Sequence, residues 1–178
     1  MKKRVVCLLV DGFEEIETVT PIDILRRADV EVVIASLRGS TVTGRCGIRV
    51  VADVNLSDLN PSSFDLLFIP GGPGVAELRA DGRAAAIARD FAAAGKPVAA
   101  ICAAPLVLMD AGLLNGRRFT AYHSVRAELG GGLGERVVID RNIITSRGAG
   151  TALDFALALV AFLLDQAAAD LVAVEIMA

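Results

Sequence analysis

The sequence predicts an α/β fold with a doubly wound, mostly parallel sheet, contained in one domain over residues 1–178. Three observations support this. Short apolar runs, such as residues 5–10 and 66–69, have the composition of strands that are buried on both faces. Helical segments separate most of these runs, as in repeated strand–helix–strand units. A chain of this length can bury about 70% of its unfolded surface in one domain.

In the first half of the chain, strands are expected at residues 4–10, 30–37 and 66–69, with a hairpin at 41–51. A helix is expected over residues 14–27, because acidic residues gather at its start and arginines at its end. Pro21 should kink or divide this helix, since proline lacks the N–H that a helix interior needs.

The second half continues the alternation. Residues 83–94 form an expected helix, and residues 98–101 a buried strand followed by a helix from Ala103. Residues 119–124 resemble a strand end that leads into a loop or helix, and residues 137–140 and 143–145 a hairpin. Thr151 is expected to cap a helix over residues 152–164, before a short helix within residues 165–178. The pattern is that of a Rossmann or flavodoxin type of sheet.

Composition argues against several classes of partner. The net charge is -3, the basic residues are spread along the chain and tryptophan is absent, so no sequence-specific nucleic-acid binding is expected. No apolar run approaches the roughly 18 residues of a membrane span. One histidine and three scattered cysteines predict neither a metal site nor a disulfide framework, and no cofactor is expected. The N-terminus lacks a signal-peptide pattern, so we expect a cytoplasmic protein.

Cys102 lies where the apolar strand 98–101 ends and a helix begins. A thiol at such a turn faces unpaired backbone N–H groups and the positive end of a helix dipole, which favour the thiolate. The turn resembles a nucleophile elbow, and the alanines on either side of Cys102 leave room for it. The alternative is a buried structural cysteine.

Three further candidates also follow strands and so belong to the same edge of a parallel sheet. Glu17 lies one turn inside the helix 14–27 and could point at the site, or it could be solvated. Gly71 and Gly72 could present N–H groups to an oxyanion, or form an ordinary turn. His123 could join them, although a lone histidine is more often a simple hydrogen-bonding residue.

Several motifs together resemble the ThiJ/PfpI superfamily, also called the DJ-1 superfamily, in the branch of the protein deglycases and glutathione-independent glyoxalases. The motifs are Gly12-Phe13-Glu14-Glu15-Ile16-Glu17, Pro70-Gly71-Gly72, Ala99-Ala100-Ile101-Cys102-Ala103-Ala104-Pro105, Ala111-Gly112-Leu113-Leu114-Asn115-Gly116 and Thr145-Ser146-Arg147-Gly148-Ala149-Gly150-Thr151. Two departures stand out. Ser124 follows His123 where the family often has proline, and Arg45, Cys46 and Arg49 leave the position of a further basic residue unassigned.

The resemblance implies a flavodoxin-like fold and a homodimer. It also implies a nucleophilic Cys102 that is hydrogen-bonded by a protonated Glu17, with His123 close by. By the same resemblance, an oxyanion would be bound by the N–H group of Gly72, in the turn that begins with Gly71, and by that of Ala103, which follows Cys102. Arg27 would lie near the pocket.

The expected function is a cysteine-dependent glyoxalase or deglycase that acts in carbonyl and oxidative stress defence. Its substrates would be methylglyoxal, glyoxal, or their early adducts on proteins and nucleotides, attacked through a Cys102 hemithioacetal. One alternative is a redox-sensing or chaperone-like protein with an oxidisable Cys102. Another is a PfpI-type cysteine peptidase, which ranks lower because no acid is evident beside His123.

Overall fold

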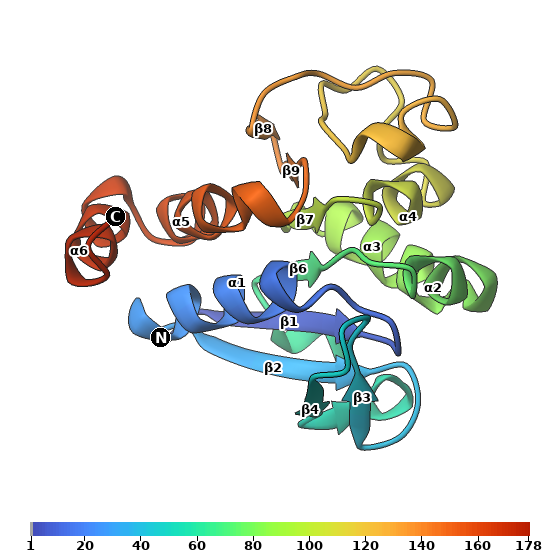
Figure 1. Ribbon diagram of the computed structural model, residues 1–178, viewed down its shortest axis with the longest axis horizontal. Helices are drawn as coiled ribbons and strands as arrows, with labels where there is room; N and C mark the ends of the chain where they lie inside the picture. Colours follow the sequence, from blue (N-terminus) through green and yellow to red (C-terminus); the bar gives the residue numbers. More distant parts are fainter. Residues whose placement is uncertain (1) are drawn as a thin grey trace.

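The computed structural model describes residues 2–178 and confirms the doubly wound α/β fold. Its main sheet has seven strands, in the spatial order β5-β2-β1-β6-β7-β9-β8 (Figure 1). Neighbouring strands are parallel, apart from the antiparallel pair β8 and β9. The strands are β1 (Arg4–Leu9), β2 (Glu31–Ser36), β5 (Val54–Asn55), β6 (Leu66–Ile69), β7 (Val98–Ile101), β8 (Val137–Asp140) and β9 (Ile143–Ser146). The hairpin of β3 (Thr41–Thr43) and β4 (Arg49–Val51) lies outside this sheet.

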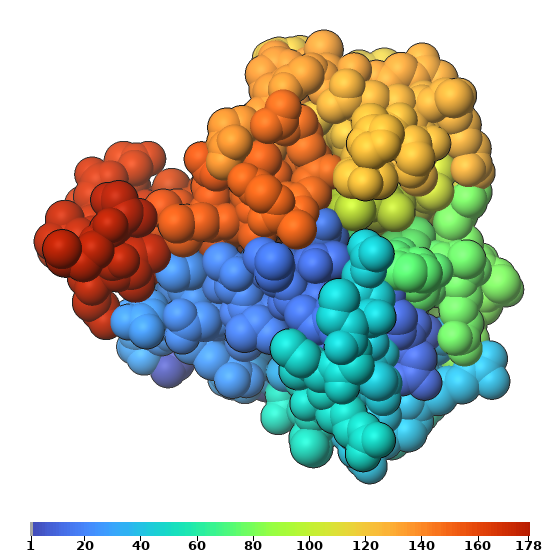
Figure 2. Space-filling model, in the orientation of Figure 1, coloured from blue at the N-terminus to red at the C-terminus, as the bar shows by residue number. Residues whose placement is uncertain are grey.

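Helices cover both faces of the sheet. One face carries α1 (Glu15–Arg27), α5 (Ala152–Leu163) and α6 (Gln166–Glu175), and α1 packs along α5. The other carries α2 (Val75–Asp81), α3 (Arg83–Ala93) and α4 (Pro105–Asp110). In Figure 2, α6 forms a projection at one end of the molecule, and the tip of the β3–β4 hairpin (cyan) reaches up between α1 and α2.

The strand sequences divide the core into two layers. In β1, Val5, Cys7 and Leu9 face the layer under α1 and α5, whereas Val6 and Leu8 face the layer under α2, α3 and α4. This division follows from the two-residue period of a strand, and it requires apolar residues at every position. All five side chains are at most 1% exposed, which is why β1 reads as an uninterrupted apolar run.

The structure corrects several expected details. Pro21 lies inside α1, which it does not divide. Thr151 stands at the start of α5, but its side chain makes no capping bond there: Oγ1 bonds the carbonyl of Gly148 and the hydroxyl of Ser146 instead. Helix α2 and the short edge strand β5 were not expected. In the segment 119–124, Thr120 forms only an isolated bridge with Leu133, and His123 begins a 3-10 turn.

The turns after β1, β6 and β7 meet at one edge of the sheet. The N–H of Glu14 donates to the carbonyl of Gly71 at 3.0 Å, and the N–H of Gly74 donates to that of Gly12 at 3.2 Å. These bonds fix the first turn against the second. The N–H of Cys102 in the third turn donates to the carbonyl of Ser146 at 3.0 Å, at the end of β9. This edge holds the candidate site.

Candidate active site

Cys102 occupies a strained turn directly after β7. Its φ is +65°, in the left-handed region that costs a residue with a Cβ atom roughly 1–2 kcal/mol. Hydrogen bonds hold this conformation from both sides, because the Cys102 N–H donates to Ser146 and the Cys102 carbonyl accepts from the Tyr122 N–H at 2.9 Å. The predicted strand-to-helix elbow is therefore confirmed. Its thiol is 9% exposed, so it opens to a pocket and not to the outer surface.

Glu17 lies in the first turn of α1 and is only 1% exposed. Its Oε2 accepts a hydrogen bond from the Gly71 N–H at 3.1 Å, and the Ala149 N–H also donates to the carboxyl. The helix start is itself fixed, because the Glu14 carboxylate accepts from the Glu17 N–H at 2.7 Å. The side chain of Glu17 therefore points inward, beside the thiol of Cys102, and not into solvent.

The two groups influence each other's protonation. Burial, and then the charge of Glu14, raises the pKa of Glu17 from 4.5 to about 7, although hydrogen bonds from its neighbours oppose this. Burial, and then the negative charge of Glu17, raises the pKa of the Cys102 thiol to about 12. The predicted backbone N–H groups do lower the pKa of Cys102, but burial and Glu17 outweigh them. At neutral pH Cys102 therefore holds its proton as a thiol, and Glu17 is protonated in part of the molecules.

Two backbone N–H groups face the thiol, those of Gly72 and Ala103. The chain can place the first of them there only because the turn is made of glycine. Gly72 has a φ of +103°, and a Cβ atom on it would lie 2.4 Å from the Gly12 carbonyl oxygen. Gly71 has no room for a Cβ either, since one would lie 2.6 Å from the Cβ of Cys102.

A pocket of about 340 Å³ opens over the thiol. Besides Glu17, Gly72, Cys102 and Ala103, it is lined by Glu14, Arg45, Pro73, Tyr122, Ser124 and Ala149. Arg45 settles the choice that the sequence left open, since Cys46 and Arg49 do not line the pocket. The sequence analysis did not predict Tyr122 in the pocket. The only indication in the sequence is that Tyr122 directly precedes the candidate residue His123.

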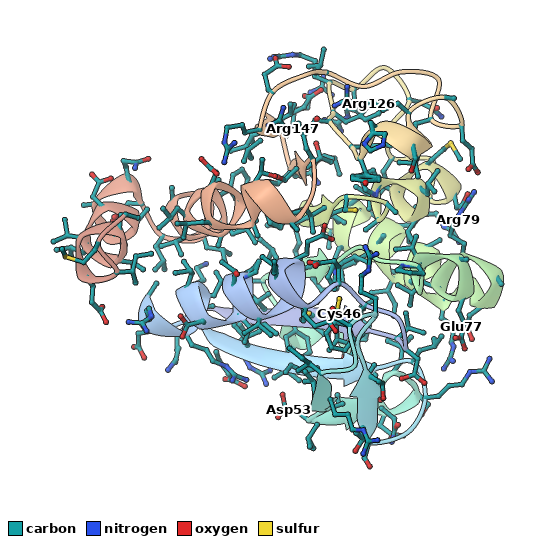
Figure 3. The ribbon with its side chains drawn as sticks, viewed as in Figure 1. Cys46, Asp53, Glu77, Arg79, Arg126 and Arg147 are labelled. Atoms are coloured by element: carbon teal, nitrogen blue, oxygen red, sulfur yellow. The ribbon has the colours of Figure 1, made fainter. Side chains whose placement is uncertain are left out.

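Arg45 reaches the pocket from the tip of the β3–β4 hairpin. Its N–H donates to the Phe13 carbonyl at 2.8 Å, and Oε1 of Glu15 accepts from the N–H groups of Cys46 at 2.7 Å and Ile48 at 3.4 Å. Figure 3 labels Cys46 at this tip, beside the start of α1. The buried Glu15 carboxylate therefore ties the hairpin to the active-site helix.

Two expected site residues lie elsewhere. His123 is exposed, stacks on Tyr122 with ring centroids 4.2 Å apart, and lines a neighbouring cavity. Arg27 ends α1, where it pairs with Asp23 at 3.0 Å and with Glu175 of α6 at 2.7 Å. Neither side chain lines the pocket of Cys102. His123 lies elsewhere because of the turn that residues 119–124 form, and Arg27 because of its ion pair with α6. The sequence reveals neither of these features.

Within residues 2–178, no three His, Cys, Asp or Glu side chains are grouped as a metal site would require. Over the same residues, none of the helices has the length and apolar character needed to cross a membrane.

Comparison with known proteins places the chain in a family. The DJ-1/PfpI family model matches residues 3–162. A DJ-1 homolog B of Arabidopsis thaliana is 42% identical over 157 residues, covering 85% of this chain and 36% of that longer protein. A putative cysteine protease of Bacillus subtilis is 41% identical, covering 83% of this chain and 90% of its own. A deglycase of Pyrococcus furiosus is 35% identical, covering 83% and 91%.

Solved structures agree over the whole fold. The oxidized DJ-1 of Toxoplasma gondii superposes with a TM-score of 0.93 at 35% identity, covering 98% of both chains. DJ-1beta of Drosophila melanogaster superposes with a TM-score of 0.94 at 33% identity, covering 99% of this chain and 98% of its own. These matches confirm the flavodoxin-like arrangement, and the chain belongs to the DJ-1/PfpI family.

Proposed function

We propose that the protein is a cysteine-dependent glyoxalase and deglycase that acts on methylglyoxal or glyoxal and on their early adducts. The observation that carries this proposal is the buried pair of Glu17 and Cys102, which meets in one pocket under the N–H groups of Gly72 and Ala103. A nucleophile, a group that can give and take a proton, and oxyanion donors are the parts that this chemistry needs. The deglycase from Pyrococcus furiosus supports the reaction class.

The first step forms the hemithioacetal. Starting from the form with an ionised Glu17, the thiol proton of Cys102 moves to the Glu17 carboxylate, and the resulting thiolate attacks the aldehyde carbon of methylglyoxal. A C–S bond forms as the carbonyl π bond breaks, and the N–H groups of Gly72 and Ala103 stabilise the new oxyanion. Glu17 then gives its proton to that oxygen, which leaves Glu17 as a carboxylate.

The second step moves hydrogen between adjacent carbons. The Glu17 carboxylate removes the proton from the former aldehyde carbon and returns it to the neighbouring ketone carbon, while the hydroxyl proton passes from the first oxygen to the second through an enediol intermediate. The first carbon is oxidised to a thioester while the second is reduced to an alcohol, so no external oxidant is needed. Water then cleaves the C–S bond and releases lactate and the thiol. We assign the relay to Glu17 and not to His123, because only Glu17 lines the pocket of Cys102.

Lactate formation from methylglyoxal without glutathione tests this proposal. The wild type should form lactate, and Cys102→Ser should lose at least about a thousandfold of the rate, because a hydroxyl is a far weaker nucleophile than a thiolate. Cys46→Ser is the matched control, since Cys46 is exposed and lies outside the pocket. Equal rates for wild type and Cys102→Ser would refute the proposal.

A second candidate function is redox sensing through Cys102. The oxidized DJ-1 of Toxoplasma gondii favours it, and the protonated Glu17 carboxyl beside Cys102 could donate a hydrogen bond to a sulfinate. Peroxide titration followed by peptide mass spectrometry tests it. Oxidation should occur at Cys102 before the buried Cys7 and the exposed Cys46, whereas uniform oxidation, or oxidation of Cys46 first, would contradict it.

A peptidase activity has less support. The putative cysteine protease of Bacillus subtilis bears that name, but a Cys–His peptidase needs an imidazole next to the thiol. His123 lines a different cavity from Cys102, and its ring stacks on Tyr122.

The expected homodimer is part of the proposal. Ile16 and Val19, three positions apart on α1, are 54% and 48% exposed, and we propose that a second subunit covers them. Sedimentation analysis at micromolar concentration should give the mass of a dimer, and a monomer at those concentrations would contradict this.

A further inference from the structure

A second cavity, of about 650 Å³, adjoins the pocket of Cys102. Tyr122 and Ala149 line both, so the two spaces are neighbours. We call the larger space the arginine cavity. Its lining residues are Ala121, Tyr122, His123, Arg126, Arg136, Arg147, Gly148, Ala149, Gly150 and Thr151.

The arginine cavity carries positive charge that its own walls do not neutralise. Arg126 donates from Nε to the Ala121 carbonyl at 3.0 Å, and Arg147 donates from Nη1 to the Gly134 carbonyl at 3.1 Å. Within residues 2–178, neither guanidinium lies within 4.0 Å of a carboxylate, although Asp154, behind the cavity wall, is close enough to Arg147 for their charges to interact. Arg136 forms an ion pair with Asp154 at 2.6 Å. Figure 3 shows Arg126 and Arg147 in the same part of the molecule, above β9.

The backbone of the arginine cavity favours the same sign of ligand. The residues from Gly148 to Thr151 lead directly into α5, so the N-terminal end of that helix opens on the cavity. A helix N-terminus attracts anions through its dipole and its free N–H groups. No aspartate or glutamate lines the cavity.

We propose that the arginine cavity is a phosphate subsite of the Cys102 pocket. A substrate would place its carbonyl carbon at Cys102 and its phosphate among Arg126, Arg147 and the start of α5. This inference rests on the function proposed above and narrows its substrate class to phosphate-bearing aldehydes and adducts. Two unpaired guanidinium groups match a dianionic phosphate with its three oxygens better than a singly charged carboxylate.

Direct binding of inorganic phosphate, followed by ³¹P NMR, is the first test. The wild type should bind phosphate, and Arg126→Gln and Arg147→Gln should each weaken binding about tenfold, because each removes charge-assisted hydrogen bonds. Arg38→Gln is the matched control, since Arg38 is exposed, pairs with Glu77 and lines neither space. Equal binding by wild type and both cavity variants would overturn the proposal, as would an absence of binding by the wild type.

The Arg126 and Arg147 side chains also hold backbone carbonyls, so their loss could loosen the loop. Arg147→Lys keeps the charge and should retain most of the phosphate affinity. In the wild type, phosphate affinity should fall as ionic strength rises, since salt screens the interaction. Affinity that does not change with salt would overturn an electrostatic subsite without any variant.

Kinetics form the second test. The ratio of kcat/KM for hydroxypyruvaldehyde phosphate to that for hydroxypyruvaldehyde should exceed one in the wild type and fall about tenfold in Arg147→Gln. The methylglyoxal adducts of guanosine 5′-monophosphate and guanosine give the same comparison for nucleotides. The pair with the larger ratio identifies the source of the phosphate, and ratios near one for both pairs would overturn the proposal.

The two proposals can fail separately. If the protein forms lactate from methylglyoxal but does not prefer phosphate-bearing substrates, the phosphate subsite is refuted and the proposed enzymatic activity stands. If phosphate binding depends on the arginines but no aldehyde is converted, the proposed enzymatic activity is refuted and the anion site stands.

Discussion

Oε2 of Glu17 and Cβ of Cys102 converge on one point, the position that a Cβ atom on Gly71 would occupy, at 2.6 Å from each. The two residues are 85 positions apart in sequence, on the first turn of α1 and directly after β7. They meet because β1, β6 and β7 are parallel neighbours, so that the turns at their carboxyl ends lie side by side. Glycine at position 71 lets them meet.

Gly71→Ala should therefore lower kcat for methylglyoxal by about a hundredfold, because the added methyl group would push the reacting groups apart. Gly134→Ala is the matched control: a Cβ atom there meets nothing within 4 Å, and its φ is not in the left-handed region. Steady-state kinetics of the two variants, each checked for folding by circular dichroism, makes the comparison. Wild-type kcat in Gly71→Ala would contradict this geometry.

Glu17→Gln should keep the pocket shape but remove the proton relay. We expect kcat to fall about a hundredfold to a thousandfold, a typical loss for a general acid or base. The pKa of Cys102, measured by the pH dependence of alkylation, should fall at the same time, since the negative charge of Glu17 raises it. An unchanged kcat would exclude Glu17 from the chemistry.

The raised pKa of Glu17 also predicts how stability changes with pH. A carboxyl whose pKa is higher in the folded chain binds its proton more tightly when folded. The free energy of unfolding should therefore fall as pH rises from 4.5 to about 7. A shift of this size corresponds to roughly 3–4 kcal/mol across that window, at about 1.4 kcal/mol per pKa unit.

Urea unfolding at several pH values measures this change. The difference in unfolding free energy between Glu17→Gln and wild type should move in favour of the variant as pH rises through that window, because glutamine has no proton to lose. A difference that stays constant between acid and neutral pH would show that Glu17 has an ordinary pKa in the folded protein.

Glu15→Gln tests the tie between α1 and the hairpin. Burial would raise the pKa of Glu15, but the N–H groups of Cys46 and Ile48 outweigh it, and the pKa lies below its usual value. A neutral amide accepts those bonds less strongly, so Arg45 should be held less firmly at the pocket and KM for methylglyoxal should rise about tenfold. Hydrogen exchange at the amides of Cys46 and Ile48 should accelerate. Unchanged exchange would show that Glu15 does not hold the hairpin tip. Glu77→Gln is the control, because Glu77 is an exposed glutamate.

The sequence predicted the parts of the fold that depend on local patterns. The apolar runs of β1, β6 and β7 have no other stable environment than a sheet covered on both faces, and the thiol after β7 had to lie at its edge. Helix α2 was missed because it follows directly on Pro70-Gly71-Gly72-Pro73-Gly74, a run typical of turns. Strand β5 has only two residues and takes its form from pairing with β2.

The parts of the site that depend on tertiary contacts could not be predicted. Arg45 reaches the pocket because Glu15 and Phe13 hold a hairpin tip, and no local pattern distinguishes it from Arg49. His123 lies in the arginine cavity because the segment after Thr120 turns away from the sheet. The sequence predicted a lowered pKa of the thiol from backbone N–H groups and a helix dipole, whereas burial, which depends on the whole fold, has the larger effect and raises it.

The most direct test of the account is mass spectrometry of the intact protein, quenched rapidly in acid during turnover of methylglyoxal so that covalent intermediates on the thiol are retained. In Glu17→Gln, whose thiol can attack the substrate but whose glutamine cannot relay the proton, the mass of one methylglyoxal adduct should be more abundant than in the wild type, and Cys102→Ser should lack this adduct. An adduct confined to surface lysines and arginines, with Cys102 unmodified in both proteins while lactate is formed, would contradict covalent catalysis at Cys102.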